Sequence, residues 1–187
     1  MLIGLMGYGG SGKSTVAARL REQHGFVTPH IKRPVVVMLS ALLRDLGYGE
    51  GEIDRVLDGD LKREVVPELG ITSTLAQQTL GKEWMRDCVR PDFLTDLWCR
   101  RIDATLAAGG HAALESTRFV DEAGAITARG GVLVEVRRPG AGPTNGHASE
   151  GIPARPNVVI QNDGSIADLH ATVDRLIAEI ASGALFA

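Results

Sequence analysis

The chain has 187 residues, which is enough for one compact domain with a hydrophobic core and too few for a second full domain. Its formal net charge of −3 gives no general attraction to nucleic acid or to an anionic membrane. Any phosphate binding must therefore come from local groups in a pocket, and neither nucleic acid nor a membrane is expected as a partner. The two cysteines, Cys88 and Cys99, lack metal-ligand spacing and are expected to be reduced thiols.

The N-terminal part predicts a strand, a glycine-rich loop and a helix. Leu2–Met6 is a short apolar run typical of a buried parallel strand. It is too short for a membrane anchor and lacks the basic flank of a signal peptide, so the cytoplasm is the expected location. Lys13–Gln23 is amphipathic and predicts the helix. A short strand is expected near Phe26, and a second helix from about Pro34 to Gly47.

The middle of the chain predicts a long helical insertion. Residues 52–109 show helical patterns and no strand, with breaks near Gly70 and at Pro91. Thr72 and Asp92 stand where they can cap or charge the starts of helices. This insertion separates the early strands from the later ones.

The last part of the chain alternates strands with helices. Strands are expected at His111–Glu115, Val132–Val136 and Asn157–Gln161, and helices at Val120–Arg129 and Ser165–Ala181. This alternation implies a parallel sheet, here of about five strands, with helices on both faces. The predicted fold class is therefore α/β.

A phosphate-binding pattern lies between the first strand and the first helix. Gly7–Ser14 (GYGGSGKS) fits G-x-x-x-x-G-K-[ST]. Glycines let such a loop turn its backbone N–H groups towards phosphate oxygens, and the following helix N-terminus adds positive partial charge. Lys13 can reach the β- and γ-phosphates, and Ser14 can ligate Mg²⁺, so ATP and Mg²⁺ are the predicted cofactors. The predicted ATP-binding residues of the loop are Gly9, Gly10, Ser11, Gly12, Lys13, Ser14 and Thr15. An ordinary glycine-rich turn is the alternative.

Two absences narrow the class of P-loop protein. A guanine-specific switch protein would be expected to show an Asn-Lys-x-Asp run for base recognition, and the sequence contains none. No long apolar strand ends in Asp-Glu, as is usual in motor ATPases. Both absences favour a small-molecule kinase.

Several later segments follow one another in a recognisable order. They are Gln77–Arg86 (QQTLGKEWMR) with Pro91-Asp92-Phe93, Thr117–Ala123 (TRFVDEA), Arg137–Glu150 with His147-Ala148-Ser149-Glu150, and Asn162-Asp163-Gly164. Together with the phosphate loop they resemble the phage-type deoxynucleoside monophosphate kinases, and the resemblance covers most of the chain. It implies a single P-loop kinase domain, 1–187. Its parts would be a core (1–31, 104–136 and 157–187), a helical acceptor-binding arm (about 32–103) and a lid over the triphosphate (about 137–156).

In the arm, the resemblance implies four acceptor-binding residues, Lys32, Gln78, Trp84 and Arg86. The open alternative is that Trp84 belongs to the core while Lys32 and Arg86 are solvated surface charges. Family members often have Pro-Arg where this chain has Ser73-Thr74. The acceptor preference is therefore expected to differ from theirs.

Three arginines are candidates for stabilising charge on the transferring phosphoryl group, and with Lys13 they are the predicted catalytic residues. Arg118 follows a strand at the edge where ligands gather in parallel sheets, and an ion pair with Glu122 is the alternative. Arg137 and Arg138 open the lid, where a cation can close over phosphates; otherwise they are ordinary loop charges.

The resemblance also implies roles for two loops and shows one departure. Asp163 lies just beyond the last strand, where it can contact the base of the donor, although a turn without a ligand is equally consistent. His147 and Glu150 match the lid, where a closing hydrogen bond is the role considered. Family members tend to carry Asp where this chain has Ser116, and the neighbouring Glu115 can supply a carboxylate for Mg²⁺ or the acceptor.

These observations predict transfer of the γ-phosphate of ATP to a deoxynucleoside 5′-monophosphate, giving the diphosphate. The expected partners are small-molecule nucleotides; a homodimer is also considered, and the location is the host cytoplasm if the chain is phage-encoded. Three alternatives stay open. They are a kinase of a hydroxymethylated pyrimidine base in DNA, a kinase of another small metabolite, and a nucleotide-binding module without transfer activity, which the Ser116 departure would suit.

Overall fold

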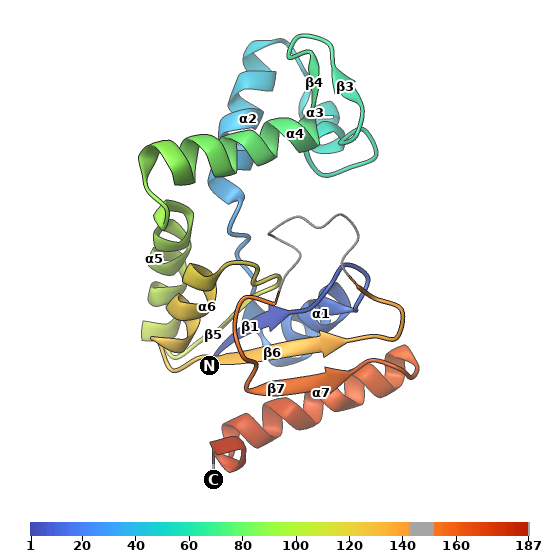
Figure 1. Ribbon diagram of the computed structural model, residues 1–187, viewed down its shortest axis with the longest axis vertical. Coiled ribbons are helices and arrows are strands. Elements are labelled where there is room, and N and C mark those ends of the chain that lie inside the picture. Colours follow the sequence, from blue (N-terminus) through green and yellow to red (C-terminus); the bar gives the residue numbers. More distant parts are fainter. Residues whose placement is uncertain (143–151, 187) are drawn as a thin grey trace. The chain divides into compact units, whose positions relative to one another are not determined.

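The computed structural model describes residues 1–142 and 152–186. The chain forms two compact units (Figure 1). Met1–Pro29 and Cys99–Ala187 form the first, called the sheet unit below, and His30–Trp98 form the second, the helical unit. The chain leaves the sheet unit after Pro29 and returns to it after Trp98, within helix α5 (Phe93–Ala107). None of the described helices is long and apolar enough to cross a membrane.

The sheet unit is built on five parallel strands in the order β2-β5-β1-β6-β7. Their bounds are β1 Leu2–Met6, β2 Phe26–Val27, β5 His111–Leu114, β6 Val132–Arg137 and β7 Val158–Gln161. In the middle of the sheet, Gly4 of β1 pairs with Leu114 of β5 and Leu133 of β6. The predicted class, an α/β fold with a parallel sheet of five strands flanked by helices, is confirmed.

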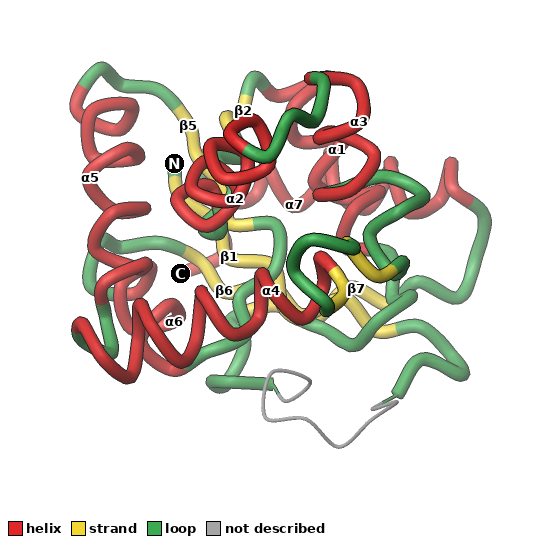
Figure 2. Tube along the Cα trace, turned by 90° about the horizontal axis from the view of Figure 1, so that it is seen from above, coloured by secondary structure: helices red, strands yellow, loops and turns green. Residues whose placement is uncertain are grey.

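Helices cover both faces of this sheet (Figure 2). α1 (Lys13–His24) and α7 (Ile166–Ala181) share one face, where Ile3 and Leu5 of β1 belong to their buried core. α6 (Val120–Thr127) packs on the other face, where a Cβ on Gly4 would lie 2.5 Å from Cδ1 of Ile126. Alternate residues of β1 thus face opposite layers, which fixes the carboxyl end of the strand from which the phosphate loop starts. A short 3₁₀ turn, η3 (Ala184–Phe186), follows α7.

The helical unit contains helices and one small hairpin. Its elements are α2 (Arg33–Asp45), α3 (Glu50–Leu57), β3 (Val65–Val66), β4 (Ile71–Thr72), α4 (Ser73–Thr79) and the π-helical continuation η1 (Leu80–Val89). Val35, Ile53, Met85 and Trp98 are among its fully buried side chains. The Thr72 prediction is confirmed, because Oγ1 of Thr72 caps α4 by accepting a hydrogen bond from the Leu75 amide at 3.2 Å.

The prediction that residues 52–109 contain no strand is wrong. β3 and β4 pair antiparallel, and the Val66 carbonyl closes their turn by accepting from the amides of Leu69 at 3.0 Å and Gly70 at 2.9 Å. Gly70 has a φ of 66°, which favours glycine. Strands of two residues are too short to show the alternation by which strands are recognised in a sequence.

Candidate active site

The predicted phosphate loop, Gly7–Ser14, leaves β1 and enters α1 through glycines in unusual backbone conformations. Gly7, Gly10 and Gly12 have φ values of 136°, 74° and 104°, which residues with a Cβ rarely adopt. A Cβ on Gly9 or Gly10 would meet no atom within 4 Å. The middle of the loop therefore has open space beside its backbone, as a phosphate cradle requires.

Both ends of the loop are pressed against neighbouring segments. A Cβ on Gly7 would lie 2.4 Å from the Val136 carbonyl oxygen, and one on Gly12 would lie 2.4 Å from Nδ2 of Asn162. Nδ2 of Asn162 donates a hydrogen bond of 2.8 Å to the Ser11 carbonyl. The sequence placed the segment around Asn162 at the base of the donor. In the structure, this buried amide holds the phosphate loop, while the next residue, Asp163, is exposed, and its contact with a base stays a prediction.

Lys13 lies folded over the loop. Its Nζ donates hydrogen bonds to the carbonyls of Gly7 at 2.8 Å and Tyr8 at 2.7 Å. Burial lowers the pKa of Lys13 below its ordinary value, the positive charge of Arg118 lowers it further, and Glu115 opposes both. The structure therefore brings three predicted site residues, Lys13, Arg118 and Glu115, within electrostatic reach of one another.

Ser14 and Glu115 fit the requirements of a magnesium–nucleotide complex. Ser14 is exposed on the first turn of α1, and Glu115 follows β5 and lies 3.6 Å from the guanidinium of Arg21. A hydroxyl and a carboxylate are oxygen donors of the kind that Mg²⁺ accepts, together with substrate phosphates and water. Within the described residues, no three His, Cys, Asp or Glu side chains gather into a metal cage. The donor set thus suits a metal that arrives with its nucleotide.

The side chain of Arg118 is held by Ser116. Its Nε donates a hydrogen bond of 3.0 Å to Oγ of Ser116. The backbone amides of Arg118 and Phe119 donate to Oε2 of Glu122 at 2.7 and 3.3 Å, so this buried carboxylate serves the start of α6. Within the part of the chain that the structure describes, the Arg118 side chain therefore hydrogen-bonds to Ser116.

The two arginines predicted to open the lid differ in their surroundings. Arg137 is the last residue of β6, and its Nε and Nη2 each donate at 2.8 Å to the carboxylate of Glu135, which is 5% exposed. A buried carboxylate needs such a partner, so Arg137 is committed to Glu135 in this structure. Arg138 is exposed. His147 and Glu150 lie outside the described residues, and a lid that closes over phosphates stays a prediction.

The helical unit contains a polar pocket of about 450 Å³. Lys32 and Gln78, both predicted to bind the acceptor, line this pocket. Arg33 and Lys62 bring two further cations, and Asp58 brings a carboxylate. The excess of positive charge favours an anionic ligand.

The other two predicted acceptor residues lie on η1 and do not line this pocket. Trp84 is 46% exposed, so the alternative that it belongs to the core is wrong; Met85 and Trp98 are the buried residues. Arg86 donates a hydrogen bond of 2.9 Å from Nη1 to the Pro91 carbonyl. Contact of Trp84 or Arg86 with an acceptor stays a prediction.

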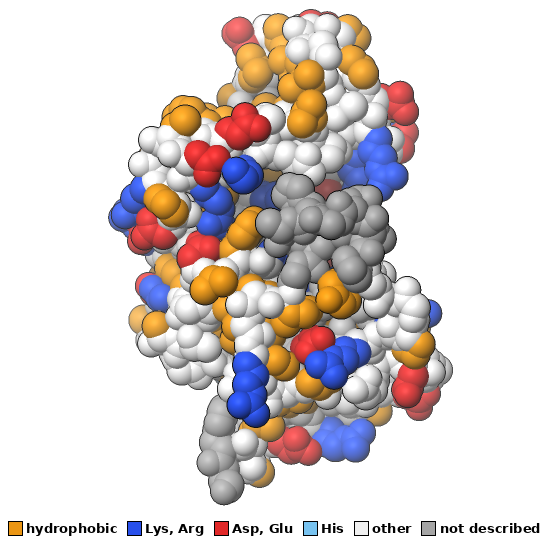
Figure 3. All heavy atoms as spheres, in the orientation of Figure 1, with side chains coloured by type: hydrophobic (Ala, Val, Ile, Leu, Met, Phe, Trp, Pro, Cys, Tyr) orange, Lys and Arg blue, Asp and Glu red, His pale blue; other side chains and the backbone are white. Residues whose placement is uncertain are grey.

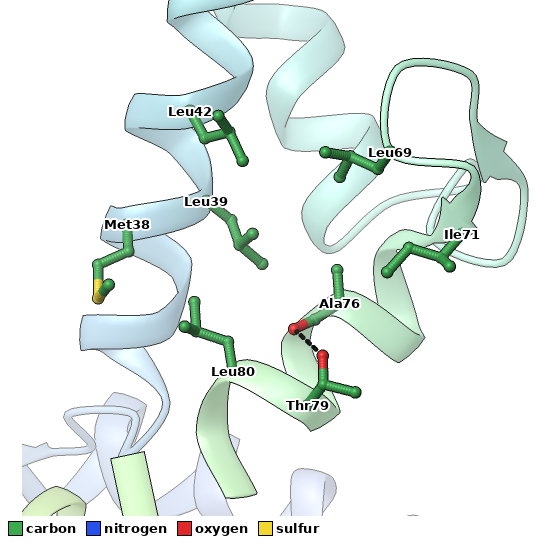
Figure 4. Close-up of a pocket in the computed structure, with 8 residues that line it drawn as sticks. All are labelled: Met38, Leu39, Leu42, Leu69, Ile71, Ala76, Thr79 and Leu80. Carbon is green, nitrogen blue, oxygen red and sulfur yellow. Dashed lines mark hydrogen bonds between the residues drawn. The ribbon is translucent and has the colours of Figure 1, made fainter. Parts of the chain in front are cut away.

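A second hollow of the helical unit, of about 380 Å³, is apolar. Leu39, Leu69 and Leu80 point into it from three different segments (Figure 4). Thr79 is the only polar residue of its lining and donates a hydrogen bond of 3.2 Å to the Ala76 carbonyl of its own helix. Hydrophobic side chains are also exposed on the surface of this unit (Figure 3). A hollow without a charged group is unsuited to phosphate.

Sequence reasoning missed several residues of these sites. Arg33 directly follows Lys32 and precedes Pro34, where a helix start was predicted, so its place at the pocket could have been recognised. Lys62 lies in a segment without a motif, and only the fold brings it to the pocket. For Asn162 the segment was recognised, but its contact with the phosphate loop was not.

No family model matches this chain. A protein of Acanthamoeba polyphaga mimivirus named "Putative deoxynucleotide monophosphate kinase" is 28% identical over 165 residues, covering 80% of each chain. Among solved structures, TT1252 from Thermus thermophilus has a TM-score of 0.48 at 20% identity, covering 96% of this chain and 97% of that one. A sugar kinase from Janibacter sp. HTCC2649 has a TM-score of 0.43 at 14% identity, covering 96% and 94%.

The parallel sheet, the phosphate loop and the viral relative together support a kinase built on the P-loop fold. The viral relative is named for a deoxynucleotide monophosphate.

Proposed function

We propose that this protein transfers the γ-phosphate of ATP to a deoxynucleoside 5′-monophosphate, producing ADP and the deoxynucleoside diphosphate. One observation carries the proposal: Lys13 lies in a glycine loop at the carboxyl end of a central parallel strand, within electrostatic reach of Arg118 and Glu115. The acceptor class is supported by the name of the viral relative and by the pocket that Lys32 and Gln78 line.

The donor half of the reaction follows from the loop. Its backbone N–H groups and the N-terminus of α1 bind phosphate oxygens, and Lys13 exchanges the carbonyls of Gly7 and Tyr8 for the β- and γ-phosphates. Ser14 and Glu115 would hold Mg²⁺, which neutralises phosphate charge when bound. The Lys13 ammonium already lies over the loop, where it donates to these two carbonyls.

The transfer step needs positioning and charge stabilisation more than proton removal. A phosphate oxygen of the acceptor forms a bond to the γ-phosphorus while the bond from that phosphorus to the bridging oxygen of ADP breaks. The acceptor oxygen carries negative charge at neutral pH, so a strong base is not required. Lys13 and Arg118 stabilise the charge that develops on the transferring group.

Release of ADP, measured by a coupled assay with each common nucleoside and deoxynucleoside monophosphate, tests the proposal. We expect turnover with at least one deoxynucleotide, and loss of turnover in Lys13→Ala. Lys82→Ala is the matched control, because Lys82 is an exposed lysine paired with Asp87 at 2.9 Å. No ADP release above intrinsic hydrolysis with any monophosphate, or an active Lys13→Ala enzyme, would refute the proposal. Labelled phosphate on a DNA polymer would indicate the alternative acceptor.

A further inference from the structure

The polar pocket of the helical unit contains two unpaired cations. Neither the Lys62 ammonium nor the Arg33 guanidinium has a hydrogen-bond or ion-pair partner within the part of the chain that the structure describes. A neighbouring cation differs: Arg55 donates to both carboxylate oxygens of Asp60, at 3.0 and 2.8 Å. The charges of Lys62 and Arg33 are therefore available to a ligand, whereas that of Arg55, which does not line the pocket, is neutralised within the chain.

The backbone that carries Lys62 is fixed to α4. The amide and the hydroxyl of Thr74 both donate to the Lys62 carbonyl, at 3.0 and 2.8 Å. Nε2 of Gln77 donates to the Leu57 carbonyl at 2.7 Å, which ties the end of α3 to the same helix. The backbone of Lys62 therefore has a fixed position in the pocket wall, and ligand binding has to order only its side chain.

The remaining lining matches a nucleotide better than a bare anion. Val36 and Leu57 supply apolar surface, and Gln78 supplies an amide that can both donate and accept hydrogen bonds. The volume of about 450 Å³ is within the range of small-molecule sites. A phosphate dianion joined to a nucleoside satisfies the cations, the apolar wall and the amide together.

We propose that Lys62, assisted by Arg33, binds the 5′-phosphate of the nucleoside monophosphate acceptor. The naming of the ligand as an acceptor rests on the proposed function. Phosphate binding by Lys62 can be measured without any transfer, because the pocket is formed by the helical unit alone.

Calorimetric titration of the full chain, without ATP, tests this assignment. The probes are the common deoxynucleoside monophosphates and the corresponding nucleosides. We expect the intact chain to bind a monophosphate more tightly than its nucleoside. Lys62→Gln should weaken monophosphate binding by roughly tenfold or more and leave nucleoside binding unchanged, while Lys62→Arg retains most of the affinity.

Arg63→Gln is the matched control, because Arg63 is the adjacent exposed cation and does not line the pocket. Thermal unfolding of each variant checks that it is folded. Equal monophosphate affinity in the intact chain and Lys62→Gln would overturn the inference, as would equal weakening by Arg63→Gln or no preference for monophosphate over nucleoside. Turnover with a Michaelis constant that Lys62→Gln does not change would sink the inference and keep the proposed function. Monophosphate binding through Lys62 without turnover would do the opposite.

Discussion

The side chain of Asn162 holds the phosphate loop through the backbone of Ser11. Nδ2 of Asn162 donates to the Ser11 carbonyl at 2.8 Å, and the two residues are 9% and 1% exposed. A buried carbonyl that loses its donor bears the full desolvation penalty. The conformation of the phosphate loop therefore depends on a residue 151 positions away in sequence.

Asn162→Ala should lower the free energy of unfolding by about 1–3 kcal/mol, because it leaves the Ser11 carbonyl unpaired and opens a gap beside Gly12. ATP affinity should fall as well, since the loop loses its fixed conformation. Urea unfolding and ATP titration measure the two effects. Gln161→Ala, at the exposed preceding position, is the control. An Asn162→Ala protein with unchanged unfolding midpoint and ATP affinity would contradict this role.

Ser116→Ala should lower kcat by about three- to tenfold, because Nε of Arg118 loses its hydrogen-bond acceptor and the guanidinium is less well placed. Since Ser116 acts through Arg118, the effect should disappear when Arg118 is already alanine. Steady-state kinetics of the two single variants and the double variant measure this coupling. Strictly multiplicative losses would show that Ser116 acts independently of Arg118.

The ion pairs of Asp174 should stabilise the protein at neutral pH, and this contribution should be lost at acidic pH. Arg19 donates to both its carboxylate oxygens at 3.0 and 2.6 Å, and Nε2 of His24 lies 2.8 Å from Oδ1, so these partners hold the pKa of Asp174 well below its usual range. A depressed carboxyl pKa contributes stability above the unfolded value, about 3.9, and the contribution is lost as pH falls below it.

The stability difference between the intact protein and Asp174→Asn should therefore be large at pH 7 and shrink as the pH falls below about 4. Urea midpoints at several pH values measure it. Glu179→Gln, an exposed position on the same helix α7, is the control and should show a smaller difference at pH 7. A difference for Asp174→Asn that does not vary with pH would count against the ion-pair explanation.

Tyr48 should titrate at unusually high pH. Its hydroxyl donates to Oε2 of Glu68 at 2.5 Å, which raises the pKa of Tyr48 to about 12. Because the folded state then holds this proton more tightly than the unfolded state, the contact stabilises the helical unit below about pH 10 and the stabilisation is lost as pH rises towards 12.

The chain has 2 tyrosines, so Tyr8→Phe leaves Tyr48 as the single tyrosine whose ultraviolet absorbance reports ionisation. We expect its midpoint near 12 in Tyr8→Phe and a clearly lower midpoint when Glu68→Gln is added. An ordinary midpoint near 10 in Tyr8→Phe would rule out a strong bond to Glu68 in solution.

The sheet and the phosphate loop could be predicted because their signals are local. Leu2–Met6 is a continuous apolar run, the loop pattern needs residues within eight consecutive positions, and the later strands alternate with helices. The β3–β4 hairpin was missed, although Val65-Val66 and Ile71-Thr72 flank a proline- and glycine-containing turn that favours one.

The pairings within the site could not be predicted because they join residues that are distant in sequence. The contact between Arg137 and Glu135 depends on which side of β6 is buried. The contact between Asn162 and Ser11 depends on how the end of β7 meets the loop. Lys62 has no motif around it, and its place follows from Thr74, which binds its backbone from another element. Such contacts are set by the packed fold.

The chain crosses between the two units at only two described points, Pro29–His30 and Trp98–Cys99. This bears on how proteins of this kind can diversify. Residues 30–98 form one uninterrupted stretch of the sequence, and the phosphate loop, Asn162, Ser116 and Arg118 all lie outside it. Exchange of this single stretch would replace the polar pocket with its lysines and leave the phosphate loop unchanged. On the proposed function, recombination at these two points would change the acceptor site independently of the ATP site.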